Sequence, residues 1–285
     1  MVAILPLLSL AATDSYDRWQ VLRDGAAAWH AMQFDGAFSV NVGDESGTLF
    51  KWDSPGFSSS STYMAGASLS KWPAAVMISG LVHDGTMTYE DLARKYLPWW
   101  TQDPADPRSR VKLWHLLSFT SGYSYDAQAS PACNYVPAPR RFLTCAESLY
   151  NNSGTYSHEP GTHWAYLTVH LQLAGAMAVA ASGMEIDKLF EKYLYKPFNM
   201  SSTTWSPLKN PTMAAGITTT ADDFEQLLQR LLTYEVCVLS LSLLLSLSLS
   251  RLLSSQKRGL APPTLSSFFL PFSCLHRCCP KRSSM

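Results

Sequence analysis

A serine and a lysine three residues apart, Ser68 and Lys71, stand just before a run of mostly apolar residues at 74–82. On an α-helix this spacing places both side chains on one face, about 4.5 Å apart along the axis. A lysine that is partly stripped of water has a lowered pKa, so it can take the serine proton and make the hydroxyl a nucleophile. The start of the helix would add backbone N–H donors where an oxyanion develops. The pair therefore predicts a serine nucleophile with a lysine base.

The same spacing recurs at residues 109–112, 206–209 and 254–257, so the spacing alone is a weak signal. Only the pair at 68–71 follows small residues and precedes an apolar run that would bury the helix and keep the pair dry. A capped helix with a solvated lysine is the alternative interpretation of any such pair. The surrounding chain has to decide between the two.

Five short segments form an ordered set of motifs: Ala67-Ser68-Leu69-Ser70-Lys71, LLSFTSG at 116–122, PGTHWAYLT at 160–168, PFNMSST at 197–203 and AGITTTAD at 215–222. In this order they resemble the motifs of β-lactamase-related serine hydrolases, the group of penicillin-binding proteins, class C β-lactamases and related esterases. The resemblance covers about residues 35–232. It implies an α+β fold in which an antiparallel sheet is flanked by helices and carries an all-helical subdomain.

The resemblance also assigns roles to single residues. Tyr166 stands where the family has a tyrosine that relays a proton to the leaving group. Thr168 replaces an asparagine that binds the substrate carbonyl, and Phe119 replaces a histidine. Tyr150 offers an alternative tyrosine, because residues 150–152 match the tripeptide Tyr-x-Asn, but it lacks the preceding Pro-Gly-Thr and is expected in a polar loop.

The third family motif, Lys-Ser/Thr-Gly or His-x-Gly on a later strand, is not found. Residues 83–85 are too early for it, and residues 257–259 have no strand pattern around them. That strand supplies the second oxyanion donor, and losing one such donor costs about 3 to 4 kcal/mol of transition-state stabilisation. We expect the C-terminal strands of the sheet to be missing as well.

Periodicity and turn residues predict the elements that position these side chains. Residues 14–33 have helical spacing and should pack on a sheet, and residues 37–42 and 48–52 should form a hairpin with a five-residue loop. Further helices are expected at 88–97, 111–117, 166–181, 186–194 and 220–232. The helix at 166–181 is rich in small residues, so we expect it at the core of the helical subdomain.

Composition sets the outer limits. The 285 residues are 47% hydrophobic, enough for a sizeable core, and the formal net charge is zero. After Glu235 there is no acidic residue and there are six basic ones, so the first 235 residues carry a charge of about −6. This charge excludes electrostatic attraction to nucleic acid as a basis for function.

Several features favour secretion. Residues 1–12 form an apolar run that ends in small residues, as a signal peptide does, although it could instead begin the first helix. Cys133 and Cys145 lie close enough in sequence for a local disulfide. Asn151 and Asn199 lie in glycosylation sequons.

The domain organisation follows from a change of composition. We expect a β-lactamase-related domain at 13–235 and a low-complexity tail at 236–285, in which leucine and serine alternate and then give way to Ser, Pro, Cys and basic residues. The tail is a poor candidate for a strand or a membrane segment, and its Cys/His cluster is a poor candidate for zinc. The histidines form no catalytic metal motif and are expected to be ordinary core or surface residues.

Together these observations predict a serine hydrolase that transfers an acyl group from an ester, amide or lactam to Ser68 without metal or organic cofactor. Its partners would be small-molecule or peptide acyl substrates, with neither nucleic acid nor a membrane, and the oligomeric state is open. Two alternatives stand beside it: a non-catalytic remnant that binds a ligand or partner, and a mis-spliced or frame-shifted product whose final 50 residues are not native.

Overall fold

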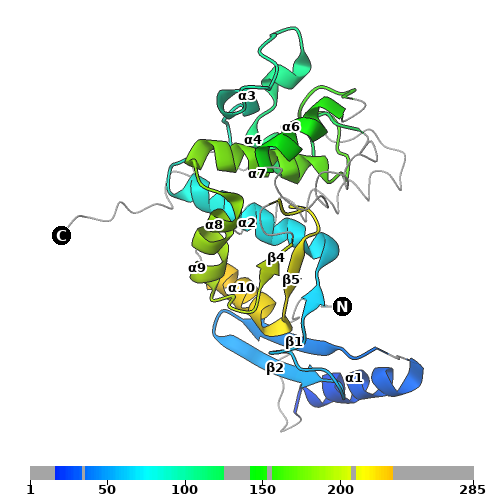
Figure 1. The fold of residues 1–285 in the computed structure, drawn as a ribbon. Helices are drawn as coiled ribbons and strands as arrows, with labels where there is room; N and C mark the ends of the chain where they lie inside the picture. Colours follow the sequence, from blue (N-terminus) through cyan, green and yellow to red (C-terminus); the bar gives the residue numbers. More distant parts are fainter. Residues whose placement is uncertain (1–16, 34–35, 125–141, 153–155, 207–209, 234–285) are drawn as a thin grey trace, which may run out of the picture. The chain divides into compact units, whose positions relative to one another are not determined.

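The computed structural model describes residues 17–33, 36–124, 142–152, 156–206 and 210–233 (Figure 1). The chain forms two compact units, residues 1–227 and 228–285. The first unit holds every element below except the end of the last helix. The expected signal peptide at 1–12 and the tail at 236–285 lie outside the described residues, so these expectations, and that of missing C-terminal strands, stay predictions.

The first elements are a helix and a hairpin, as predicted. Helix α1 (Gln20–Gln33) precedes the antiparallel strands β1 (Ser39–Asp44) and β2 (Gly47–Asp53). Trp19, just before the helix, stacks on Phe50 with ring centroids 5.5 Å apart, and His30 meets the ring of Trp52 edge-on. These ring contacts confirm that the helix packs on the hairpin.

The turn of this hairpin is shorter than predicted. Asp44 pairs with Gly47, so the turn has two central residues instead of a five-residue loop. The Asp44 carboxylate accepts hydrogen bonds from the backbone N–H and the hydroxyl of Ser46, which closes a tight turn. Gly47 has a φ of +134°, which favours glycine and lets the second strand begin there. The polar run was mistaken for a loop because its side chains hydrogen-bond to their own backbone.

A second, very short sheet carries the chain into the serine–lysine segment. Strand β5 (Ile217–Thr219) lies between β3 (Met64–Ala65) and β4 (Thr204–Trp205), and both pairings are antiparallel. Among the described residues, the strands therefore form two small sheets instead of the single one expected. Strand β3 leads through a 3-10 turn (Ala67–Ser70) into the buried helix α2 (Lys71–His83).

Helix α7 (Val169–Ser182) is the centre of a helical subdomain, as predicted. It contacts α2, α3 (Ala93–Tyr96), α4 (Leu113–Leu117) and α6 (Phe142–Asn152). The small residue Gly175 makes room for this packing, because a Cβ there would lie 3.0 Å from the ring of Phe142 and 3.1 Å from Met213.

Helix α6 was not predicted. Its buried positions recur with helical spacing at Phe142, Cys145, Ala146, Leu149 and Tyr150. This signal was present in the sequence, but the Pro, Asn and Ala residues before it led us to expect a loop. The helix places Tyr150 in a buried position.

The remaining helices differ from expectation mainly at their ends. The helix expected at 88–97 is only α3, because Leu92 first forms a bridge to Lys112. The helix expected at 186–194 is α8 (Ile186–Phe190), followed by a π-helical turn (Glu191–Tyr195) and α9 (Lys196–Phe198). Helix α10 (Ala221–Thr233) begins as predicted, since the hydroxyl of Thr220 accepts the N–H of Asp223. None of the described helices is both long and apolar enough to cross a membrane.

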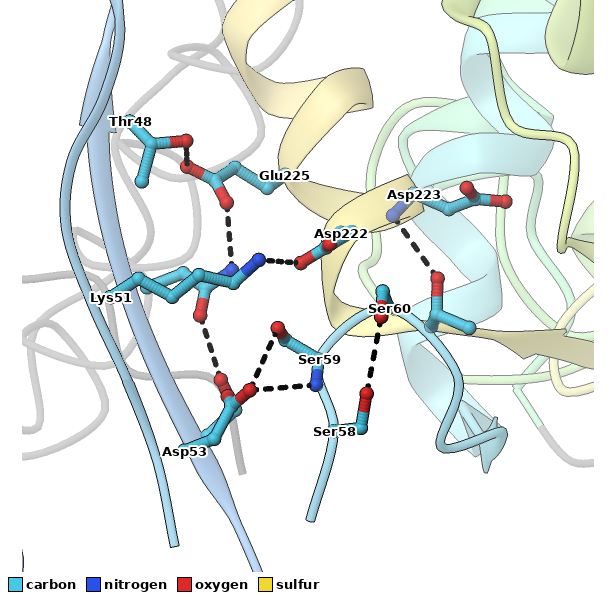
Figure 2. Close-up of polar contacts among 12 residues, drawn as sticks. Thr48, Lys51, Asp53, Ser58, Ser59, Ser60, Asp222, Asp223 and Glu225 are labelled. Atoms are coloured by element: carbon cyan, nitrogen blue, oxygen red, sulfur yellow. Dashed lines mark hydrogen bonds and ion pairs between the residues drawn. The ribbon is translucent and has the colours of Figure 1, made fainter.

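Polar side chains tie the start of α10 to the β1–β2 hairpin, in a group that we call the hairpin clasp: Asn41, Thr48, Lys51, Asp222 and Glu225 (Figure 2). The Glu225 carboxylate accepts from Asn41 at 2.7 Å and from Thr48 at 2.6 Å. Lys51 pairs with Asp222 at 2.5 Å. Asp53 accepts from the N–H and hydroxyl of Ser59 in the adjoining loop, which extends these contacts (Figure 2).

Candidate active site

The structure places Ser68 and Lys71 side by side at the junction between the 3-10 turn and α2. In a 3-10 turn, residues three apart are nearly eclipsed, so the lysine lies over the serine. The Lys71 amine donates to Ser68 Oγ at 3.0 Å and to the carbonyl of Ala214 at 3.0 Å. Two acceptors on different segments therefore hold the amine beside the hydroxyl.

The segment that carries Ser68 is fixed to strand β5 on both sides. The N–H of Gly66 donates to the carbonyl of Ile217 at 2.8 Å, and Ser70 Oγ accepts from the N–H of Ile217 at 3.0 Å. Between these anchors, Ala67 adopts a φ of +41°, which is uncommon for a residue with a Cβ. The sharp bend at Ala67 directs the chain from the strand into the turn.

Tyr166 joins this pair, in the position relative to Lys71 that the resemblance implies. The Lys71 amine lies 4.6 Å from the centroid of the Tyr166 ring, and Phe119 stacks on the same ring at 5.9 Å. Partial burial acts to raise the pKa of Tyr166, but hydrogen bonds to Ser68 and Lys71 and the charge of Lys71 outweigh it, so this pKa lies below its ordinary value. The Tyr166 ring thus lies against the Lys71 amine, beside Ser68.

Tyr150, the alternative tyrosine, lies elsewhere. It is buried on α6, its hydroxyl accepts from the N–H of Thr101 at 3.1 Å, and its ring lies 4.6 Å from that of Trp100. Its contacts are those of a core residue of the helical subdomain. The geometry therefore favours Tyr166.

The expected exclusion of water is not found around the hydroxyl itself. The apolar run buries α2, but Ser68 is exposed and the Tyr166 side chain is 53% exposed. Lys71 is half-buried between them. A bound substrate would have to displace water from this open side of the group.

The other candidate residues are placed as follows. Thr168 is half-buried at the N-cap of α7, where its carbonyl accepts from Gln172 N–H at 3.4 Å, and its substrate-binding role stays a prediction. Cys145 is buried and disulfide-bonded, but Cys133 lies outside the described residues, so their pairing stays a prediction. Asn151 and Asn199 are exposed, as a glycan acceptor has to be. Within the described ranges, no three His, Cys, Asp or Glu residues form a group that could hold a metal ion.

Sequence reasoning missed two buried residues behind Tyr166. Ser121 and His170 are both fully buried and hydrogen-bonded to each other at 2.9 Å. Ser121 belongs to the LLSFTSG segment, and His170 follows the PGTHWAYLT segment by two residues. Their positions beside these motifs were the only available signal, and helix periodicity gave no reason to pair them.

Known proteins match both the sequence and the fold. A protein of Salmonella typhimurium, provisionally assigned as a D-alanyl-D-alanine carboxypeptidase, is 23% identical over 133 residues, which are 45% of this chain and 30% of that protein. The structure of a provisionally assigned β-lactamase from Bacteroides dorei matches with a TM-score of 0.61 and 25% identity, over 76% of this chain and 64% of its own. A β-lactamase/D-alanine carboxypeptidase from Pseudomonas syringae matches with a TM-score of 0.57 and 15% identity, over 73% and 64%.

The likeness to the two solved structures shows that the chain has the β-lactamase/transpeptidase-like fold, with helices and antiparallel sheets. The chain spans less than a third of the length of the Salmonella relative and about two thirds of the two solved structures. The beta-lactamase family model matches residues 29–236, nearly three quarters of the chain, and the protein therefore belongs to the beta-lactamase family.

Proposed function

We propose that this member of a hydrolase family acts by acyl transfer to Ser68 from a small-molecule or peptide ester, amide or lactam. The observation that supports this most directly is the 3.0 Å distance from the Lys71 amine to Ser68 Oγ, with the Tyr166 ring over the same amine. The motif order and the family match support the same assignment. They leave the identity of the acyl group open.

The arrangement supports a two-step mechanism. Lys71 acts as the general base that takes the proton from Ser68 Oγ, and Oγ attacks the carbonyl carbon of the substrate. The proton passes through the Tyr166 hydroxyl to the leaving group as its bond to the acyl carbon breaks. Water then attacks the ester on Ser68 along the same route, and the proton returns to Oγ.

Binding without turnover is the second candidate. It is favoured by Thr168, which offers a hydroxyl where the family has an amide. It is also favoured by the lack of a third motif in the expected place, since before residue 236 only residues 83–85 fit the pattern and they lie too early in the chain. A single missing oxyanion donor would slow acylation and deacylation more than it would weaken binding. A mis-spliced product would have the same consequence.

We also infer that the protein enters the secretory pathway. The disulfide bond at Cys145 supports this, because disulfides persist in oxidising compartments. The exposure of Asn151 and Asn199 supports it further, because a glycan needs an accessible acceptor.

A fluorophosphonate probe followed by peptide mass spectrometry tests the nucleophile. We expect the label on Ser68, no label in Ser68→Ala, and a rate lowered by about 100-fold to 10,000-fold in Lys71→Ala, since that is the usual contribution of a general base. Ser109→Ala is the matched control, because Ser109 has the same spacing to Lys112 but is buried. Its labelling should equal that of the wild type.

Two outcomes would decide against the proposal. Labelling that persists in Ser68→Ala would place the nucleophile elsewhere. A folded wild type that takes no label would favour binding without turnover. Hydrolysis of a p-nitrophenyl ester by the same samples separates single labelling from repeated turnover, which also requires deacylation.

A further inference from the structure

A fully buried histidine links two of the motif segments behind Tyr166. His170, in the first turn of α7, has Nδ1 at 2.9 Å from Ser121 Oγ and Nε2 at 3.0 Å from the carbonyl oxygen of Ala165. Both Ser121 and His170 have no exposed surface. The imidazole therefore bridges the LLSFTSG segment and the residue directly before Tyr166.

The partners of the ring determine which nitrogen carries the proton. The carbonyl oxygen of Ala165 can only accept a hydrogen bond, so Nε2 must donate to it. In a neutral imidazole Nδ1 is then an acceptor, and it receives the hydroxyl proton of Ser121. Both hydrogen bonds can form in only one orientation of the ring, so His170 fixes the position of Ala165 relative to Ser121.

The link ends on the backbone that carries Tyr166. The carbonyl of Ala165 accepts a hydrogen bond from His170, and the backbone N–H of Ala165 donates to the carbonyl of Phe119 at 3.0 Å. The Phe119 ring stacks on Tyr166 at 5.9 Å and meets the edge of His170 at 5.2 Å. Both polar groups of Ala165 are thus fixed, and the aromatic ring that supports Tyr166 rests on the same histidine.

Tyr166 itself is 53% exposed, so burial of its own side chain does little to fix it. Its place 4.6 Å from the Lys71 amine depends on the backbone at Ala165 and on the Phe119 ring. A misplacement of about 1 Å at a reacting group can lower a rate by about 100-fold. His170, which holds Ala165, can therefore affect the reaction rate without touching the substrate.

We propose that His170 is a positioning residue that sets the Tyr166 hydroxyl against Ser68 and Lys71. This inference rests on the proposed function, in which Tyr166 relays the proton. It assigns to His170 a role separate from the packing of α7.

Two substitutions of similar size separate positioning from packing. His170→Asn places a side-chain amide near the former Nδ1, so this variant keeps the contact with Ser121 and loses the donor to Ala165. The longer side chain in His170→Gln reaches further and places a donor near the former Nε2. We expect His170→Asn to lower the Ser68 labelling rate by up to about 100-fold, and His170→Gln to restore most of it.

A double-mutant cycle that combines His170→Asn with Tyr166→Phe shows whether the change in labelling rate depends on the Tyr166 hydroxyl. If His170 acts by placing the phenol, His170→Asn should have almost no further effect on labelling once the hydroxyl is gone. An equal loss of rate in both backgrounds would mean a general structural role and would overturn the proposal. Circular dichroism and thermal melting of each variant check that it is folded.

A third measurement does not depend on activity. The phenol of Tyr166 can be titrated by ultraviolet difference absorbance against Tyr166→Phe. We expect His170→Asn to raise the pKa of Tyr166, because the phenol loses its contacts with Ser68 and with the charge of Lys71, and His170→Gln to leave it lowered. An unchanged titration in His170→Asn would overturn the proposal even where no labelling is seen, whereas a wild type without label would overturn only the proposed function.

The wild type also offers a direct check that needs no variant. Nitrogen-15 NMR of the histidine side chains reports the tautomer, and the geometry requires the proton of His170 on Nε2. A proton on Nδ1 would remove the donor to Ala165 and sink the assignment.

Discussion

Gly66, two residues before the nucleophile, has no room for a side chain. Its N–H bonds the carbonyl of Ile217, and a Cβ on Gly66 would overlap Ile217 Cγ2. The next residue, Ala67, is bent into a region of positive φ. The orientation of Ser68 is therefore set by the backbone at Gly66 and Ala67.

Gly66→Ala should destabilise the protein by about 1 to 3 kcal/mol, because the added methyl forces the buried Ile217 or the β3–β5 pairing to shift. Urea unfolding measures the change. In an Ile217→Ala background the same substitution should be much less destabilising, since the overlapping Cγ2 is gone. Ile217→Val is the control that retains Cγ2 and should give no such relief, and a cost that is the same in all three backgrounds would contradict this explanation.

Only some of the contacts in the candidate site could be predicted from the sequence. The contact between Ser68 and Lys71 follows from local helix geometry, so the spacing predicted it. Tyr166 is almost a hundred residues away, and only the resemblance pointed to it. Phe119 and His170 meet through the tertiary fold, where side-chain spacing along the chain carries no information.

At the scale of elements, α4 shows how a short helix depends on one buried side chain. His115 accepts the backbone N–H of Lys112 through Nδ1 at 3.0 Å, at the N-terminus of this five-residue helix. Burial, with a smaller contribution from the charge of Lys112, lowers the pKa of His115 to about 4. The histidine is thus neutral in the folded protein at pH values where it is protonated when unfolded.

This difference predicts acid destabilisation. Because the folded pKa of about 4 lies below the ordinary value of 6.5, the unfolded state binds the extra proton as the pH falls between these values. Stability should be complete above about pH 6.5 and fall by up to about 3 kcal/mol towards pH 4. Urea unfolding across this range should show a shallower pH dependence for His115→Asn, whose side-chain oxygen can still accept from Lys112. Equal slopes in the two proteins would contradict the assignment.

The two long helices α7 and α10 were predicted within a few residues. Helix α7 was found because its sequence is one long apolar run, which is buried from Val169 to Ala178, and α10 because Thr220 marks its start. The hairpin turn was wrong by three residues, since Asp44 and Ser46 close it with side-chain hydrogen bonds that composition does not show. Helix α6 was missed because the residues before it dominated the interpretation.

At the largest scale, the unit formed by residues 1–227 is joined by contacts between its first and last elements. The hairpin clasp connects residues separated by 171 to 184 positions. No local pattern indicates such contacts, so the sequence could predict the hairpin and α10 but not their attachment. Glu225 is almost fully buried there, at 9% exposure, and both its carboxylate oxygens are in use.

Glu225→Ala should lower the free energy of unfolding by about 1 to 3 kcal/mol, because it removes the buried carboxylate that accepts hydrogen bonds from the half-buried Asn41 and the exposed Thr48. Lys51→Ala is the matched control, since its pair with Asp222 is about one third exposed and should be worth no more than about 1 kcal/mol. Chemical denaturation of both variants compares the two contacts. A larger loss in Lys51→Ala would reverse this ranking.

The hairpin clasp cannot form during biosynthesis until Glu225 has been added to the chain. A ribosome adds about 5 to 20 residues per second, so Glu225 is made roughly 10 to 35 seconds after Asn41 and Thr48. During this interval the hairpin has already emerged from the ribosome, and Asn41 and Thr48 donate to water because the Glu225 carboxylate has not yet been made. Closure of the unit therefore has to wait for the last part of its own synthesis, and nascent chains arrested before residue 225 should be more easily cleaved by protease within the hairpin than chains arrested well beyond it.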